Sequence, residues 1–369
     1  MNSQHVETLI IGAGQAGLTT GYHLRRRGRR FLIVDGNQRI GDNWRQQWDT
    51  LRLYTPAKYD GLPGLPFPAA RWHFPSKDEV GAYLERYALQ FDLPVRTNTR
   101  VQRLEARADG GYVAFVGEEA ISCDNVVVAT GSFGRTPNLP DFAGELDPAI
   151  GQLHSSEYRR PAQLQPGPVL VVGASHSGQD IAYELAETRR TILCGPSRGN
   201  IPMRPESRRA HVLMPVVIFV FKHVLTRRTP MGRKRVRDVR LHGGPHFRVK
   251  PQDLDRRGVL RHEARLNGVA DGRPVLGDGT VVDVRNVVWC TGFRQVFDWI
   301  RLPILDEHKW PVEYRGVVAA APGLFFCGLS FQYAYASMVF PGIGRDADYV
   351  ARQIVARSVA ARPASAAVA

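Results

Sequence analysis

The chain has 369 residues, of which 43% are hydrophobic and 23% are charged, so it can bury one large core or two ordinary cores and is not intrinsically disordered except at its ends. Its net charge is +14, and residues 198–261 contribute +13, from 14 Arg and 3 Lys against four acidic side chains. Such a basic block suits nucleic acid, anionic lipid, a phosphorylated cofactor or a solvated surface, and charge alone does not choose among them.

The beginning of the chain contains no recognisable targeting signal. Residues Met1 to Glu7 lack a basic segment, and the apolar run that follows stops at Gly12, too early for a signal peptide or a membrane span. The four cysteines lie far apart and form no C-x-x-C pair, so neither a disulfide framework, a metal site nor a redox-active dithiol is indicated. We therefore expect a cytoplasmic protein.

The first motif is a glycine-rich loop between a strand and a helix. Residues His5 to Ile11 read as a buried strand and run directly into the sequence GAGQAG, which opens a helix. Gly12 permits the tight turn, Gly14 lets the backbone approach a pyrophosphate, and Gly17 lets the helix pack closely on the strand. The loop therefore predicts a dinucleotide whose phosphates lie at the positive end of the helix.

An acidic residue at the end of the next strand supports this interpretation. The apolar strand Phe31 to Val34 ends at Asp35, a carboxylate expected to accept a hydrogen bond from a ribose hydroxyl. A 2′-phosphate at this position would face the Asp35 charge, so FAD or NAD is favoured over NADP.

The same arrangement recurs about 160 residues later. The strand Val169 to Val172 leads into GASHSG at Gly173 to Gly178 and a helix from about Gln179 to Thr188. The next strand, Thr191 to Cys194, is followed by Ser197 and Arg198 in place of a carboxylate. A hydroxyl and a guanidinium suit a 2′-phosphate, so this loop predicts NADPH.

The remaining elements predict a domain inserted into another. A capping box at Ser76 opens a helix that extends to about Gln90, and buried strands end at Ala129 and Cys290 before Thr-Gly turns. We expect an α/β fold with two Rossmann-like dinucleotide-binding domains in three layers. The FAD domain is predicted at 1–160 and 275–369, and the NADPH domain at 161–274 with a basic insertion at 198–261.

Six short motifs occur in order along nearly the whole chain: Gly12 to Gly17, Gly41 to Trp44, Ala129 to Gly131, His154 to Tyr158, Gly173 to Asp180 and Cys290 to Phe293. In order and spacing they resemble the class B flavin monooxygenases, that is, the flavin-containing monooxygenases and their YUCCA-like relatives. The resemblance implies that NADPH reduces FAD and that O2 then forms a C4a-hydroperoxyflavin, which transfers one oxygen to a small organic substrate.

The residues expected to bind the two cofactors are Gly12, Gly14, Gln15, Ala16, Gly17, Asp35, Trp44, Thr130, Gly131, Gly173, Ser175, His176, Ser177, Gly178, Ser197, Arg198, Thr291 and Gly292. Candidates for a catalytic or positioning role are Tyr54, His154 and Tyr158, although His154 and Tyr158 also suit a purely structural pair. Tyr158 replaces a Trp of Baeyer–Villiger enzymes, and Tyr54-Thr55-Pro56 lacks the Asn of N-oxygenating relatives, so the type of oxygenation stays open.

Two other functions are compatible with the sequence. One is a flavin reductase that passes electrons to a protein or a quinone, and the other is a flavin redox sensor whose basic block contacts nucleic acid or a membrane. The leading interpretation requires O2 and a small lipophilic substrate, with no nucleic acid, and leaves the oligomeric state open. We expect the apolar segment 212–221 to be a packed helix, with peripheral membrane contact through 212–235 as the alternative.

Overall fold

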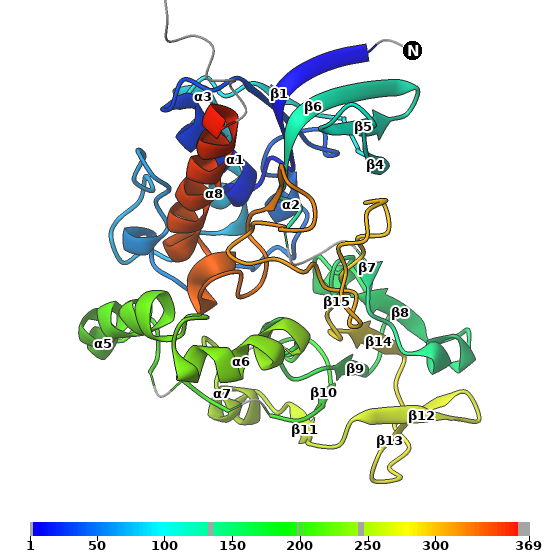
Figure 1. Ribbon diagram of the computed structural model, residues 1–369. Helices are drawn as coiled ribbons and strands as arrows, with labels where there is room; N and C mark the ends of the chain where they lie inside the picture. Colours follow the sequence, from blue (N-terminus) through cyan, green and yellow to red (C-terminus); the bar gives the residue numbers. More distant parts are fainter. Residues whose placement is uncertain (1–2, 132–135, 198, 202, 243–246, 361–369) are drawn as a thin grey trace, which may run out of the picture.

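The computed structural model describes residues 3–131, 136–197, 199–201, 203–242 and 247–360. Two β-sheets divide the chain into an upper and a lower half, with α1, α3 and α8 in the upper half and α5, α6 and α7 in the lower half (Figure 1). Each half contains one of the two glycine-rich loops, so the two predicted nucleotide-binding units are both present.

The first sheet has the order β3-β2-β1-β6-β5-β4, with β16 beside β6. Its β3, β2, β1, β6 and β16 are parallel, whereas β5 and β4 add an antiparallel extension. The strands are β1 (Ser3–Ile11), β2 (Phe31–Val34), β3 (Val95–Arg96), β4 (Arg103–Ala106), β5 (Tyr112–Val116), β6 (Glu119–Val128) and β16 (Leu324–Phe326). The helices are α1 (Gln15–Arg25), α2 (Asp42–Arg45), α3 (Lys77–Gln90) and α8 (Phe340–Ala360), with 3-10 turns at Ala57–Tyr59 and Tyr335–Met338.

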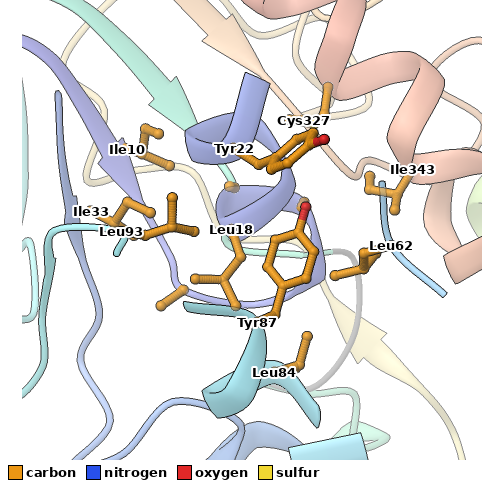
Figure 2. Close-up of a cluster of buried hydrophobic side chains, with 14 of the residues drawn as sticks. Ile10, Leu18, Tyr22, Ile33, Leu62, Leu84, Tyr87, Leu93, Cys327 and Ile343 are labelled. Carbon is orange, nitrogen blue, oxygen red and sulfur yellow. The ribbon is translucent and has the colours of Figure 1, made fainter. Parts of the chain in front are cut away.

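Side chains of the first sheet alternate between two buried clusters because successive residues of a strand point to opposite faces. Ile10 of β1 packs with α1, α3 and α8, whereas its neighbours Leu9 and Ile11 pack against the loop-rich segment 297–321 on the other face. Figure 2 shows Ile10 in the same cluster as Leu18 of α1 and Tyr87 of α3. The sheet is therefore covered on both faces, as the three-layer prediction requires.

The second sheet is wholly parallel, with the order β11-β10-β9-β14-β8. Its strands are β8 (Gly151–His154), β9 (Val169–Val172), β10 (Thr191–Cys194), β11 (Leu260–His262) and β14 (Asn286–Trp289). All four residues of β9 are buried, alternately against α4 (His176–Leu185) with α7 (Pro251–Arg256) and against the hairpin β12 (Leu266–Ala270) and β13 (Arg273–Leu276). Burial on both faces explains why β9 is an unbroken apolar run.

A two-stranded ribbon marks the place where the chain passes between the halves. β7 (Thr136–Pro137) pairs antiparallel with β15 (Phe293–Arg294), and 3-10 turns at Asp141–Glu145 and Pro161–Gln163 follow β7. β8 ends before residue 160 and β14 begins after residue 275, and the two strands pair in the second sheet. Both strands therefore lie outside the predicted inserted domain. We therefore propose domain boundaries at the β7–β15 ribbon.

The basic segment forms α5 (Arg208–Phe219), a π-helix (Val220–Val224), α6 (Pro230–Leu241) and α7. The expected packed helix therefore exists as α5, although it is buried on one side only. Among the described residues, none of the helices is both long enough and apolar enough to cross a membrane.

Candidate functional site

The first glycine loop has a backbone path that other residues could not follow. Gly12 has φ of 112°, and an ideal Cβ on it would lie 2.5 Å from the carbonyl oxygen of Ala129. A Cβ on Gly17 would lie 1.8 Å from the carbonyl oxygen of Gly12. These contacts place the start of α1 directly against the end of β1, with Ala129 of the neighbouring strand end beside them.

Gly14 is required for a different reason. Its backbone is extended, and a Cβ there would meet no protein atom within 4 Å, so the protein itself leaves this position open. Gly14 is the N-cap of α1, whose first turn contains no acidic residue, and the first N–H groups of a helix have no partner within it. The adjacent Gln15 has a buried Oε1 with no hydrogen-bond partner among the described residues. Open space, free donors and positive helix potential fit a pyrophosphate.

Asp35 lies at the end of β2, as predicted, and is almost fully buried. Its Oδ2 accepts a hydrogen bond from the Ala13 N–H at 2.7 Å, and its Oδ1 accepts one from the Asn37 N–H at 2.8 Å. Each carboxylate oxygen has two lone pairs, so Asp35 can hold the loop and still accept a bond from a ribose hydroxyl.

A cavity of about 230 Å³ extends from this loop. It is lined by Gly12, Thr130 and Gly131, together with Arg100 and the segment Phe293 to Phe297. The structure therefore brings together the first loop and the Thr130-Gly131 turn, which the sequence placed more than 100 residues apart. The lining also includes Val34 and Gly36, the two neighbours of Asp35 in the chain.

The second loop repeats two close glycine contacts of the first loop. Gly173 has φ of 108°, and its Cβ would lie 2.4 Å from the carbonyl oxygen of Cys290, which occupies the place of Ala129. A Cβ on Gly178 would lie 1.8 Å from the carbonyl oxygen of Gly173. Ser175 is the N-cap of α4, and the first turn, with His176 and Ser177, contains no acidic residue. This loop therefore also fits a phosphate.

A carboxylate that the sequence did not indicate, Glu263, lies beside the residues that follow β10. The Ser197 N–H donates a hydrogen bond to Oε2 of Glu263 at 3.0 Å, and both residues line a small hollow with Gly195. The other residue expected to bind the 2′-phosphate, Arg198, lies outside the described residues. Glu263 follows β11, which pairs with β10, and this pairing is not visible in the sequence.

Tyr54 connects the two nucleotide-binding units. Its hydroxyl donates to Oδ2 of Asp180 on α4 at 2.9 Å, and Nη2 of Arg248 lies 3.0 Å from the same oxygen. The Tyr54 ring lies 4.8 Å from the ring of His176 and 6.2 Å from that of Phe247. Burial raises the pKa of Asp180, an effect that Arg248 opposes, and burial with the nearby Asp180 raises the pKa of Tyr54. Tyr54 is therefore a protonated donor at neutral pH.

His154 and Tyr158 make structural contacts inside the second unit. The Ser156 N–H donates to Nδ1 of His154, so the ring proton is on Nε2, which donates to the Gly292 carbonyl at 3.0 Å. Burial lowers the pKa of His154, which keeps the ring neutral. The Tyr158 hydroxyl donates to Oε2 of Glu184 at 3.1 Å, and burial followed by this carboxylate raises its pKa.

The contacts of His154 and Thr291 hold the ribbon between the halves. The Thr291 hydroxyl donates to the Asn138 carbonyl beside β7, and the Asn138 N–H donates to the Gly292 carbonyl. Trp44 packs partly buried against the cores of both halves and lies 6.1 Å from the ring of Phe340. These residues therefore join the two halves, and a direct cofactor contact remains a prediction for them.

Asp60 is a buried carboxyl group that the sequence did not single out. The Thr55 hydroxyl donates to its Oδ1 at 2.5 Å, while Oδ2 has no hydrogen-bond partner among the described residues. Burial raises the pKa of Asp60 from 3.8 to about 8, so it is mostly protonated at neutral pH. It lies on the same loop as Tyr54, beside the junction of the two units.

Comparison with known proteins identifies the class of molecule. The family model described as pyridine nucleotide-disulphide oxidoreductase matches residues 9–239. The chain belongs to this family. It is 35% identical to an uncharacterized CzcO-like oxidoreductase of Geobacillus kaustophilus, in an alignment that covers 95% of this chain and 99% of that protein.

This oxidoreductase is also similar to monooxygenases. A flavin-containing monooxygenase from Stenotrophomonas maltophilia matches with a TM-score of 0.75 and 26% identity, over 96% of this chain and 99% of that one. Indole-3-pyruvate monooxygenase YUCCA1 of Oryza sativa subsp. japonica is 33% identical over 180 residues, which are 48% of this chain and 44% of that protein. These findings confirm the resemblance to class B flavin monooxygenases and the predicted fold. At the level of the family, they also confirm an oxidoreductase with FAD and NADPH as cofactors.

The cysteines of this oxidoreductase are not arranged for disulfide chemistry. Cys123, Cys194, Cys290 and Cys327 are all buried and free. Burial raises the pKa of Cys194 to about 11 and those of Cys123 and Cys327 to about 12, and it also raises that of Cys290. A thiol in this state is a poor nucleophile, since the thiolate is the reactive form.

We expect Gly14→Val to remove flavin without unfolding the protein. A Cβ at this position meets no protein atom within 4 Å, and the side chain starts into the open space beside the helix start. FAD binding should weaken at least about tenfold, while the free energy of unfolding of the apoprotein changes by less than about 0.5 kcal/mol. Titration of FAD fluorescence and urea unfolding measure the two quantities. Gly17→Ala is the contrasting control, because its Cβ clash should destabilise the apoprotein by about 1–3 kcal/mol.

We expect Glu263→Gln to improve the use of NADPH. The amide oxygen can still accept the Ser197 N–H bond, but the negative charge that would repel a 2′-phosphate is removed. At low ionic strength KM for NADPH should fall about threefold or more, as expected for an exposed charge pair, while KM for NADH stays unchanged. Initial rates with both nucleotides test this, and an equal change for both would contradict it.

We expect Asp60→Asn to change the pH dependence of stability. Between about pH 4 and pH 8 the folded protein retains a proton on Asp60 that the unfolded chain has lost, so stability falls as the pH rises through this window. Relative to the wild type, the variant should gain up to about 1.4 kcal/mol per pH unit. Urea unfolding at several pH values measures the difference, and a constant difference would show that Asp60 is ionised in the folded state.

Proposed function

We propose that this oxidoreductase is a monooxygenase that uses NADPH, a proton and O2 to insert one oxygen atom into a small lipophilic molecule, with NADP and water as the other products. The proposal rests mainly on the similarity to flavin monooxygenases along nearly the whole chain, combined with two nucleotide-binding units that Tyr54 and Trp44 join. When bound, the flavin would accept the hydride and activate O2.

The residues of the chain bind and orient the cofactors. Gly14 and the N-terminus of α1 would hold the FAD pyrophosphate, Asp35 its ribose, and Thr130 with Gly131 would line its cavity. Ser175 and the N-terminus of α4 would hold the NADPH pyrophosphate, with Ser197 beside its 2′-phosphate. No conventional acid or base is needed, because the cofactors supply the redox chemistry.

Tyr54 acts as a positioning residue in this proposal. It links the loop after the first fingerprint to α4, so it helps to fix the distance between the two nucleotide units. Arg248 holds Asp180 through the same carboxylate oxygen that accepts the Tyr54 bond. The neutral ring of His154, the last residue of β8, donates a hydrogen bond to the Gly292 carbonyl. This bond stabilises the ribbon that joins the two units.

The surroundings of Tyr54 support a lipophilic substrate. A buried cluster of Met203, Met214 and Phe247 packs beside it, and Tyr59 and Trp72 lie against this cluster. Flexible methionines and aromatic rings form adaptable apolar surfaces. Tyr54 occupies the position at which N-oxygenating relatives carry an Asn, so this position offers no side-chain amide for a substrate amine, which favours oxygenation at sulfur or carbon over nitrogen.

A flavin reductase that passes electrons to a quinone or a protein is the second candidate. The buried cysteines argue against a thiol relay but not against an external acceptor. This alternative requires the hydride step and no transfer of oxygen to the product.

Oxygen transfer separates the two candidates. The holoprotein is incubated with NADPH and isotope-labelled O2 in the presence of a panel of lipophilic thioethers, ketones and amines, and the products are analysed by mass spectrometry. We expect one labelled oxygen atom per product molecule and one NADPH consumed per turnover. If NADPH consumption instead yields an equal amount of H2O2 or of reduced quinone, with no labelled product, the monooxygenase proposal is wrong.

A further inference from the structure

The helix α5 has two different apolar faces. Ala210, Met214 and Ile218 are buried in the small cluster beside Tyr54. Val212 and Phe219 are 73% and 58% exposed, and Leu213 and Val216 are exposed as well. At 100° per residue, these outward side chains lie opposite the buried ones. The outward apolar face is therefore additional to the one that packs the helix against the protein.

Basic side chains are concentrated on α5, on α6 and between them, and Asp238 of α6 is the one carboxylate in the sequence from Arg208 to Leu241. From Arg208 to Arg237 the sequence contains nine Arg and Lys residues and no Asp or Glu. Of these residues, Arg208 and Arg209 are exposed at the start of α5, and Arg233, Lys234 and Arg237 are exposed on α6. In the described part of the chain, these five cations form no ion pair with a carboxylate. Figure 1 shows α5 at the outer edge of the lower half.

We propose that the outward surface of α5 and α6 binds a membrane that contains anionic lipids. Exposed aliphatic and aromatic side chains enter the boundary between headgroups and acyl chains, and the basic side chains contact the lipid phosphates. The helix lies on the membrane, because at 12 residues it is too short to cross one. The inference does not depend on the oxygenation reaction.

The chemistry of the surface distinguishes this occupant from two others. Nucleic acid would use the cations, but the four exposed apolar residues of α5 would gain nothing from phosphates. A second copy of the chain would cover the apolar residues but would bring two unpaired basic helices together. Anionic lipid satisfies the apolar and the basic residues at once.

The position of α5 gives this contact a route to the proposed substrate site. The inner face of the helix packs on the cluster that contains Phe247, and the loop residue Trp72 stacks on His211 at 3.9 Å. Tyr54 lies against the same cluster and contacts His176 of the second loop. A molecule dissolved in the membrane would thus meet the protein beside the junction of the two nucleotide units.

Vesicle flotation tests the proposal with the FAD-loaded full chain. We expect the wild type to float with vesicles of equal amounts of phosphatidylcholine and phosphatidylglycerol at low salt, and to bind phosphatidylcholine vesicles at least about tenfold more weakly. The combined substitution Val216→Asp and Phe219→Asp should weaken binding to the anionic vesicles at least about tenfold, since it removes apolar contact and adds negative charge. The combined substitution Arg233→Gln and Lys234→Gln should weaken it about tenfold at low salt and less at high salt.

Leu89→Asp is the matched control, because Leu89 is an 80% exposed apolar side chain on α3 in the other half of the molecule. It should bind vesicles like the wild type, and all variants should retain FAD. The proposal is overturned if the wild type stays unbound at low salt, or if Leu89→Asp loses as much binding as the α5 variant. Binding to duplex DNA that depends on Arg233 and Lys234 but not on Phe219, without vesicle binding, would identify a nucleic-acid surface. A dimer that Phe219→Asp dissociates, without vesicle binding, would identify a contact between copies.

Discussion

An ideal Cβ on Gly17 would lie 1.8 Å from the Gly12 carbonyl oxygen, and one on Gly178 would lie 1.8 Å from that of Gly173. Both helices can begin against their strands because these two positions carry no side chain. The N-termini of α1 and α4 are thereby directed toward the ends of the parallel strands, which is also where the strands deliver Asp35 and Ser197. Every other feature of the two nucleotide sites depends on this close packing of helix and strand.

Burial determines whether a charged side chain of this protein needs a partner. Asp180 is a carboxylate buried between the two halves, and it is tolerated because Tyr54 and Arg248 both hydrogen-bond to it. Removing one partner would leave a poorly compensated charge, so the junction favours a defined arrangement of the units. By contrast, the exposed cations Arg208, Arg209, Arg233, Lys234 and Arg237 of α5 and α6 remain in solvent, where they cost little and remain available for a partner.

Features that depend on neighbouring residues could be predicted from the sequence. The capping box at Ser76 and the helix to Gln90 occur as predicted, because both bonds of the box join residues three apart. The helix after the second loop begins at His176, three residues earlier than predicted, since the loop itself supplies its first turn. Contacts across long separations could not be predicted. Glu263 reaches Ser197 through the pairing of β11 with β10, and Arg248 reaches Asp180 from the insertion. The assignment of β8 and β14 likewise follows from sheet pairing, which local patterns do not encode.

The chain crosses between the halves twice, and the two crossings run side by side as the hydrogen-bonded strands β7 and β15. A single linker would allow the two halves to separate and to rotate independently. A hydrogen-bonded two-stranded ribbon resists stretching more than it resists twisting. The Tyr54–Asp180 hydrogen bond joins the units at a second place, so a rotation of the second unit about the ribbon would have to break this bond.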